Sequence, residues 1–199
     1  MAVWKSLPGE TPIDDISGLK IKAITTRRQL NVLEAENIRH VIVKYLSAKP
    51  SRRSARFDYS WSVRLHKEMF GRVWKWAGVL RTCDLNIGGP WRHIETRLYT
   101  LMGNLSSWQQ GGMEFVEQAA RLHHESVAIH PFLNGNGRWA RMLANIWLKQ
   151  HDHPPTAWPE ETVGQVSRLR THYLHAVRKA DQGDIEPLLD LHRRFTPNS

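Results

Sequence analysis

The stretch His130-Pro-Phe-Leu-Asn-Gly-Asn-Gly-Arg-Trp-Ala-Arg141 brings together a candidate base, a glycine-rich turn and two arginines within twelve residues. Pro131 disfavours helix at the residue before it, so a helix that arrives from Phe115 should end near Ile129 and leave His130 in a loop. Few segments that serve only to build a fold need this combination. This loop is therefore the candidate functional site.

The glycines of this stretch indicate a phosphate-binding turn. Gly135 and Gly137 flank Asn136, so backbone N–H groups can converge there without obstruction from Cβ atoms. The chain then re-enters a helix through Trp139 and Leu143. These N–H groups should therefore lie at a helix N-terminus, where unpaired donors and the helix dipole favour an anion. The pattern predicts a di- or triphosphate as the occupant.

Two arginines follow the turn. Arg138 and Arg141 lie three residues apart on one face of the predicted helix, and both can reach a bound phosphate with forked donors. A Gly-Asn-Gly sequence alone is more often an ordinary turn. Its fixed offset from His130 and from both arginines favours the phosphate site.

The same stretch resembles the core motif of the Fic (Fic/Doc) domain family, which reads His-x-Phe-x-(Asp/Glu)-Gly-Asn-Gly-Arg-x-x-Arg. It matches at every defined position except Asn134, where the family usually carries an acid. Segments 71–78 and 81–88 look like the approach to the family's β-hairpin flap, and 178–188 looks like its closing helices. The resemblance implies a mainly α-helical domain with a single β-hairpin flap.

The N-terminal part of the chain resembles one subgroup of that family. Segments 11–18 and 24–31 are similar to the bacterial Fic subgroup called mobile mystery protein B. Together with the motif and the segments that flank it, they extend the resemblance over most of the 199 residues.

The resemblance implies a protein adenylyltransferase. In the family, the motif histidine acts as general base on a Ser, Thr or Tyr hydroxyl of a target protein, which attacks the α-phosphate of ATP and becomes modified with AMP. His130 would take this role, for which imidazole is suited because its neutral form is abundant at cellular pH. The alternative is a core histidine packed behind Ile129. The motif implies a nucleotide site made of Phe132, Gly135, Asn136, Gly137, Arg138 and Arg141, in which Phe132 is interpreted as the core anchor of the loop.

Asn134 is the departure from the family pattern. The family's acid at this position ligates a Mg²⁺ ion that bridges two phosphates, and hard cations prefer charged oxygen donors. An asparagine carbonyl can still ligate Mg²⁺, but it brings no negative charge. We therefore expect a weak magnesium ligand at Asn134, with an impaired enzyme as the alternative.

The predicted flap comprises Thr82, Cys83, Asp84, Leu85, Asn86, Ile87 and Gly88. By resemblance, it would dock a target protein by pairing with its extended backbone. The alternative is an ordinary surface hairpin.

An inhibitory glutamate is also implied. Many Fic proteins carry, or are bound by, a helix with the pattern (Ser/Thr)-x-x-x-Glu-(Gly/Asn), whose Glu pairs with the second motif arginine. This sequence matches at Glu36 and Asn37 but has Val32 in place of the hydroxyl residue. The resemblance implies a Glu36–Arg141 ion pair that blocks ATP. The alternatives are an exposed glutamate and inhibition by a separate antitoxin-like partner.

Length and periodicity predict one domain. The 199 residues are 41% hydrophobic and contain no repeat that divides them, so we expect an N-terminal arm at 1–24 packed on a domain at 25–199. Thr25 or Thr26 should cap the first helix. Helical spacing predicts segments from about residue 27 to before Pro50, then 57–71, 95–109, 113–129, 136–150, 160–180 and 185–195.

Charge and hydropathy limit the kinds of partner and the location that we expect for this protein. The formal net charge is +9, and residues 20–56 hold ten Lys and Arg against Glu34 and Glu36. This basic stripe could bind nucleic acid or an acidic protein, although a solvated helix face is the favoured alternative. Apolar runs are too short for a membrane span and the N-terminus lacks a secretory pattern, so we expect a cytoplasmic bacterial protein.

Two rival functions remain at this level. A Doc-like kinase would transfer the γ-phosphate, but Doc-type motifs carry Ala and Lys where this chain has Gly135 and Arg138. A non-catalytic module that binds nucleic acid or a partner on the same fold is suggested by the basic stripe and by Asn134. Salt-sensitive retention on DNA without nucleotide transfer would favour the second rival.

Overall fold

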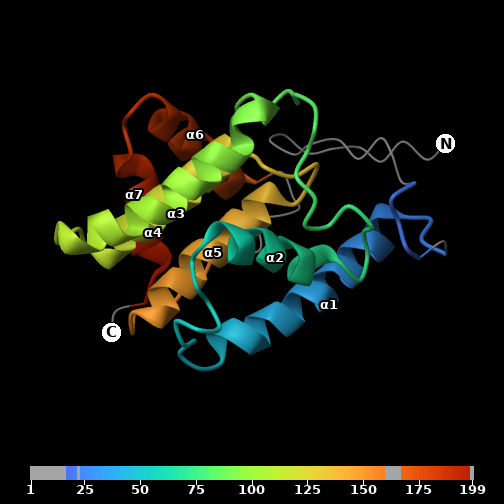
Figure 1. The fold of residues 1–199 in the computed structure, drawn as a ribbon, viewed down its shortest axis with the longest axis horizontal. Coiled ribbons are helices and arrows are strands. Elements are labelled where there is room, and N and C mark those ends of the chain that lie inside the picture. Colours follow the sequence, from blue (N-terminus) through green and yellow to red (C-terminus); the bar gives the residue numbers. More distant parts are fainter. Residues whose placement is uncertain (1–16, 22, 160–166, 198–199) are drawn as a thin grey trace.

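Seven α-helices and one 3₁₀-helix make up most of the computed structural model, which describes residues 17–21, 23–159 and 167–197 (Figure 1). The elements are α1 (Arg27–Leu46), α2 (Tyr59–Phe70), η1 (Trp91–His93), α3 (Ile94–Gln110), α4 (Phe115–Ile129), α5 (Asn136–Gln150), α6 (Arg168–Asp181) and α7 (Glu186–Phe195). The prediction of a mainly α-helical fold is confirmed.

Helix α5 lies at the centre of the fold. It packs against α4 on one side and against α1 and α2 on the other, while α6 and α7 pack together and against α4 (Figure 1). The helix that follows the glycine-rich turn is therefore held on several sides at once. This arrangement fixes the position of the motif loop relative to the rest of the domain.

The first helix begins where the sequence predicts. Thr26 caps α1, because its side chain accepts from the Gln29 N–H while the Gln29 side chain reaches back to the Thr26 N–H. The helix ends at Leu46, before Pro50. Predicted bounds are also met closely for α3, α4, α5 and α7. Of the predicted helix 160–180, residues 160–166 lie outside the described residues, and α6 begins at Arg168.

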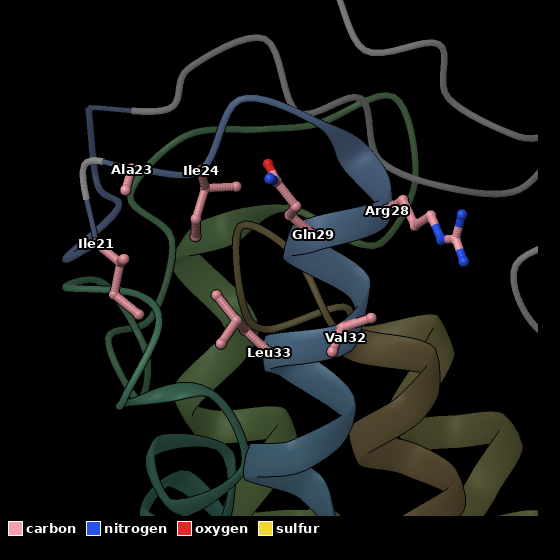
Figure 2. Close-up of a pocket in the computed structure, with 7 residues that line it drawn as sticks. All are labelled: Ile21, Ala23, Ile24, Arg28, Gln29, Val32 and Leu33. Atoms are coloured by element: carbon pink, nitrogen blue, oxygen red, sulfur yellow. The ribbon is translucent and has the colours of Figure 1, made fainter.

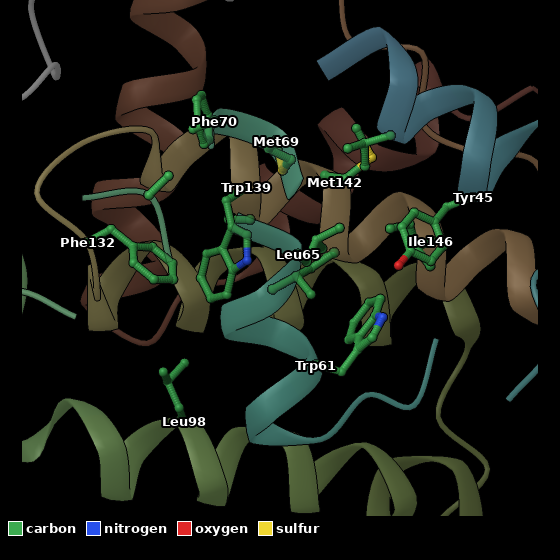
Figure 3. Close-up of a cluster of buried hydrophobic side chains, with 14 of the residues drawn as sticks. Tyr45, Trp61, Leu65, Met69, Phe70, Leu98, Phe132, Trp139, Met142 and Ile146 are labelled. Atoms are coloured by element: carbon green, nitrogen blue, oxygen red, sulfur yellow. The ribbon is translucent and has the colours of Figure 1, made fainter. Parts of the chain in front are cut away.

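Aromatic side chains dominate the core (Figure 3). Trp61, Leu65, Phe132 and Trp139 are fully buried and pack between α2, α5 and the motif loop. Phe57 belongs to the apolar run that predicts α2, but it precedes that helix, with a positive φ of 52°, and the helix starts after the Asp58 cap. Full burial of a large aromatic side chain stabilises a fold by about 3 kcal/mol.

The expected β-hairpin is not formed. No residue between 75 and 90 belongs to a strand. The carbonyls of Cys83 and Gly89 accept from the Arg81 guanidinium, and the Gly89 N–H donates to the Ala128 carbonyl at 3.2 Å. Because these groups find partners on an arginine and on the end of α4, they do not pair with each other in a ladder. The segment is an irregular loop, although the residue types of Val79, Thr82, Leu85 and Ile87 suit short strands.

The described end of the N-terminal arm packs on the domain. Leu19 is buried and forms an antiparallel bridge with Trp74, while the Lys20 N–H donates to the Val73 carbonyl at 2.9 Å. Residues 1–16, including most of the 11–18 segment that resembles the mobile mystery protein B subgroup, lie outside the described residues.

Within the described ranges, no helix is both long and apolar enough to cross a membrane. The basic stripe of residues 20–56 is more positive at the surface than its composition suggests. Of its two acids, Glu34 is buried and Glu36 is exposed. One carboxylate therefore remains on the surface of this stripe to oppose its arginines and lysines.

Candidate active site

His130 sits at the exit of α4, as Pro131 predicts. It is the C-cap residue of that helix and adopts a left-handed conformation, with φ 52° and ψ 60°. Its N–H donates to the Ser126 carbonyl at 3.2 Å, which closes the last turn. The residue is only 6% exposed. The histidine therefore leaves the helix but does not leave the protein interior.

The surroundings of His130 keep its ring neutral. Burial lowers its pKa to about 4, the positive charge of Arg81 adds to this lowering, and a hydrogen bond to the Val127 carbonyl opposes it. A neutral imidazole that donates one N–H to a carbonyl can accept a proton at its other nitrogen. The geometry thus suits a general base.

Asn136 closes the loop that follows His130. Its side-chain oxygen accepts from the Phe132 N–H at 2.9 Å, and its amide nitrogen donates to the Phe132 carbonyl at 2.8 Å. Phe132 itself is fully buried and packs edge-on to Trp139. The two residues therefore fix the path of the chain between the histidine and α5. Both side chains thus make these contacts within the domain.

His66, on α2, supports the same loop from behind. Its Nε2 donates to the Asn134 carbonyl at 3.0 Å, its Nδ1 accepts from the Gly78 N–H at 3.0 Å, and its ring stacks on Phe132 with centroids 3.6 Å apart. Burial lowers its pKa to about 3, so the ring stays neutral. These two bonds define its tautomer, with the proton on Nε2.

The start of α5 has the form of an anion-binding helix terminus. Gly135 is the N-cap in a left-handed conformation with φ 81°, and a Cβ there would lie 2.7 Å from the Phe70 ring. The first ladder bond runs from the Trp139 N–H to the Gly135 carbonyl. The N–H groups of Asn136, Gly137 and Arg138 precede that bond and are oriented along the positive end of the helix dipole.

Asn134 uses its side chain locally. Its Oδ1 accepts from the Gly135 N–H at 2.6 Å, so the oxygen that would ligate a metal is turned toward the backbone. This bond also uses one N–H of the glycine-rich turn. Within the described ranges, no group of three or more His, Cys, Asp or Glu side chains could hold a metal ion.

Arg138 is held by an acid that the sequence analysis did not single out. Its Nη1 lies 2.6 Å from Glu34 Oε2, and the Glu34 side chain is 2% exposed. The other carboxylate oxygen of Glu34 accepts from Trp74 Nε1 at 2.6 Å. The guanidinium also lies over the Phe70 ring, at 4.7 Å. One of the two motif arginines is therefore already paired.

Arg141 is buried against aromatic rings. Its guanidinium lies 5.4 Å from the Tyr173 ring centre and 6.0 Å from that of Trp158. Its Nη1 is buried and has no hydrogen-bond partner among the described residues. A Cβ on Gly137 would be 3.9 Å from its Nη2, so the guanidinium lies beside the first turn of α5. A buried donor without an acceptor favours an anionic ligand at this point.

The platform under Arg141 is a buried polar network. The Tyr173 hydroxyl lies 3.0 Å from His123 Nε2, and His123 Nδ1 lies 3.0 Å from His192 Nε2. Burial lowers the pKa of both histidines, that of His192 to about 3. The network joins α4, α6 and α7 and fixes the rings on which the arginine rests.

The prediction of a Glu36–Arg141 ion pair is wrong, because the two residues do not meet. Glu36 is exposed on α1, whereas Arg141 packs on Trp158 and Tyr173. The core-facing positions of α1 are Leu30, Glu34, Asn37, Val41 and Tyr45. Two residues along a helix turn a side chain by about 200°. The glutamate that reaches a motif arginine is therefore Glu34, and its partner is Arg138.

One of the predicted flap residues, Gly88, lies against His130, and none of the seven belongs to a strand. Thr82, Cys83, Asp84, Asn86 and Gly88 are exposed, while Leu85 and Ile87 are half-buried. Gly88 has φ 96°, and a Cβ there would lie 2.4 Å from His130 Cβ. The loop thus covers one side of the histidine, and only glycine permits this close approach.

Sequence reasoning missed three supporting residues, which are Glu34, His66 and Arg81. Ser62, His66 and Met69 are spaced by four and three along α2, so helical spacing could have marked His66 as core-facing. The same spacing from Leu30 marks Glu34 as an acid on a buried face. Arg81 lies in irregular chain and carries no comparable signal.

An apolar cavity lies away from this chemistry. It has a volume of about 390 Å³ and lies between the N-terminal turns of α1 and the preceding segment, lined by Ile21, Ala23, Ile24, Arg28, Gln29, Val32 and Leu33 (Figure 2). Gln29 already serves in the helix cap, and Arg28 points away from the apolar lining. No histidine lines the cavity, and its one arginine is not directed into it.

The fold and the loop define a class of protein, an α-helical domain with a buried histidine beside an anion-binding helix N-terminus. Residues 56–148 match the family model described as Fic/DOC family. Among curated proteins, "Protein adenylyltransferase Fic" of Drosophila grimshawi is 31% identical over 132 residues, which cover 64% of this chain and 26% of that protein. The chain spans about a quarter of the length of the curated relatives it matches.

Solved structures have the same fold. The N-terminal Fic domain of a VirB-translocated Bep effector from Bartonella quintana superposes with a TM-score of 0.69 at 22% identity, covering 90% of this chain and 88% of that one. The BepC protein of Bartonella tribocorum, solved with bound AMPPNP, gives a TM-score of 0.67 at 19% identity over 88% of this chain and 90% of that one. The chain therefore shares the fold of these domains, and its residues 56–148 are similar to the Fic/DOC family model.

Proposed function

We propose that this protein is a Fic-type protein adenylyltransferase, which moves AMP from ATP to a Ser, Thr or Tyr hydroxyl of a target protein. The observation that carries the proposal is a buried, neutral His130 next to the glycine-rich N-terminus of α5. The likeness to curated adenylyltransferases over 132 residues supports it. The sequence also supports placing the protein in the bacterial mobile mystery protein B subgroup and in the cytoplasm.

In the proposed reaction, His130 takes the proton of the target hydroxyl as that oxygen bonds to the α-phosphorus of ATP. The bond from the α-phosphorus to the bridging oxygen breaks, and pyrophosphate leaves. The N–H groups at the start of α5 and the guanidinium of Arg141 hold and neutralise the phosphates. Such transfers ask mainly for positioning and charge stabilisation, which these groups supply.

Magnesium would accompany ATP. The described site offers one amide oxygen, that of Asn134, which now accepts from the Gly135 N–H. A bound ion would neutralise phosphate charge, and it would be held mainly by phosphate oxygens with Asn134 as a weak protein ligand. Asn136, with both side-chain atoms bonded to Phe132, remains a loop-fixing residue.

We also propose that α1 restrains the enzyme through Glu34. ATP needs the cationic groups beside α5, and Arg138 is paired with Glu34 at 2.6 Å. The Glu34 carboxylate is nearly excluded from solvent, so water screens the pair less than it screens a surface ion pair. An antitoxin-like partner is then not required to supply the acid.

Mass spectrometry tests the proposed function. The protein is incubated with ATP, Mg²⁺ and added cell proteins. The intact masses of the protein and of the cell proteins are then recorded. An AMP adduct is expected. A phosphate adduct would instead indicate the Doc-like kinase reaction. Unmodified proteins together with salt-sensitive DNA retention would indicate the binding module.

Replacing Asn134 with Asp should raise transfer at limiting Mg²⁺. The added carboxylate supplies charge where the phosphates hold the ion, and the expected gain is roughly 10-fold in apparent metal affinity. Rates of AMP transfer across a Mg²⁺ series would show this as a lower half-saturating concentration. Wild-type protein that outperforms Asn134→Asp at low Mg²⁺ would contradict this role for Asn134.

The pH dependence follows from the lowered pKa of His130. A base must be neutral, so transfer should require His130 above its pKa of about 4. Since burial favours the neutral form, kcat/KM should stay level from about pH 8 to about pH 5 and fall only below that. A profile that already falls near the ordinary histidine pKa, about 6.5, would contradict the assignment.

A further inference from the structure

Arg81 is the most completely enclosed charged group around the motif loop. Its side chain is fully buried, at 0% exposure, and its nearest acid is the exposed Asp84, with Nη1 and Oδ1 3.6 Å apart. Asp84 Oδ1 also accepts from the Trp91 N–H at 2.8 Å. Carbonyl oxygens are therefore the main hydrogen-bond acceptors of the guanidinium. An arginine that only formed a surface ion pair would not need these acceptors.

The acceptors of Arg81 belong to two segments that meet at the site. Nε donates to the His130 carbonyl at 2.7 Å, and Nη2 reaches the Ile129 carbonyl at 3.4 Å. Nη1 donates to the Cys83 carbonyl at 2.7 Å, and Nη2 also donates to the Gly89 carbonyl. One guanidinium thus joins the last residues of α4 to both ends of the loop that covers His130.

The backbone of Arg81 adds to this junction. Its N–H donates to the Pro131 carbonyl at 3.0 Å, so the residue contacts the carbonyls on three successive residues from Ile129 to Pro131. These carbonyls lie at or just beyond the end of α4, where the helix lacks donors for them and its dipole favours a positive charge.

The conformation that Arg81 holds is one that histidine rarely adopts. His130 has φ 52°, a left-handed backbone that is disfavoured for residues with a Cβ and persists where neighbouring contacts enforce it. Gly88 provides the second contact, since a Cβ there would lie 2.4 Å from His130 Cβ and 3.2 Å from Arg81 Nη2. The direction of the histidine ring follows from this backbone.

We propose that Arg81 is a positioning residue of the transferase site, which holds the His130 backbone in its left-handed conformation and joins it to the covering loop. Arg81 does not contact ATP or the target hydroxyl in this account. The inference rests on the proposed function for its kinetic consequence. Its structural consequence, the state of the His130 ring, can be measured without any transfer.

Arg81→Gln is the main test, with Arg97→Gln as its matched control. Arg97 is half-buried and donates to the neighbouring Ala128 carbonyl at 3.4 Å, but not to His130. Arg81→Gln should lower kcat for AMP transfer by about 100-fold, the order that a displacement of about 1 Å in a reacting group can cause. The KM for ATP should not change, and Arg97→Gln should behave as wild type.

The second readout is an NMR titration of His130, assigned by the signal missing from His130→Ala. Arg81→Gln removes the nearby positive charge, so the pKa of His130 should rise toward its ordinary value. Arg81→Lys keeps the charge but loses the fork, so it should lower kcat while the titration stays near that of wild type. If Arg81→Gln does not fold, Arg81→Lys replaces it as the test variant for kcat.

Wild-type kcat in either folded Arg81 variant would overturn the proposal, as would a loss expressed in the KM for ATP. Failure of the proposed function is distinguishable, because it would appear as absence of transfer in wild type and all variants. In that case the backbone NMR chemical shifts of His130 decide. Shifts that are the same in wild type and folded Arg81→Lys would overturn the positioning role, and shifts that leave the left-handed region would support it.

Discussion

His130→Ala should abolish AMP transfer while ATP binding survives. The neutral, buried ring is the group placed to take the proton of the target hydroxyl, and loss of a general base costs about 10²- to 10⁴-fold in rate. The triphosphate is held by other groups, at the start of α5 and on Arg141. Transfer of labelled AMP, measured beside isothermal titration with ATP, should show the rate lost and the Kd unchanged.

A second histidine provides the control for this prediction. His124→Ala replaces a histidine one turn or more before the loop, whose Nε2 lies 2.8 Å from Asp181 on the surface, and transfer should persist. Undiminished transfer by His130→Ala would refute the general-base role. Loss of ATP binding in the same variant would show that His130 is instead part of the nucleotide cradle.

Glu34→Gln should activate the enzyme by about 10-fold or more. The substitution keeps an oxygen that can accept from Trp74 Nε1 but removes the charge that holds Arg138. A hydrogen bond between charged groups contributes about 1.5–3 kcal/mol, which corresponds to roughly 10- to 150-fold in an equilibrium constant. The rate of self-modification or target modification at subsaturating ATP is the measurement.

Glu36→Gln is the matched control for that result. Glu36 lies on the same helix but is exposed, so its replacement should leave transfer unchanged. Melting temperatures would verify that both variants fold. Equal transfer by wild type and Glu34→Gln would reject restraint by α1 and direct the search to a separate partner.

Helical periodicity and capping residues were sufficient to predict most of the fold. The Thr26 cap, the apolar run through Trp61 and Leu65, and the proline after His130 act over a few residues each, so local sequence contains their effect. The prediction of a β-hairpin is wrong because the contacts that determine this segment come from residues distant in the sequence. The partners of the 81–90 backbone are a buried arginine and the end of α4, which the residue types of the segment cannot reveal.

The candidate site also has a part that the local sequence predicts and a part that it does not. The sequence predicts a site in the loop from His130 to Arg141 because its glycines and arginines have a fixed spacing. The groups that determine its state come from elsewhere in the chain, with Glu34 on Arg138, His66 on the Asn134 carbonyl and Arg81 on the His130 carbonyl. The partial motif predicts Glu36 as the inhibitory residue, whereas helical register places Glu34 on the buried face.

ATP labelled at the α-phosphate, compared with ATP labelled at the γ-phosphate, tests the central claim most directly. Each is incubated with Glu34→Gln protein and Mg²⁺, alone and with cell proteins, beside the double variant that also carries His130→Ala. The account predicts protein-bound label from the α-phosphate only, and its loss in the double variant. Label from the γ-phosphate alone, or α-label that persists without His130, would contradict it.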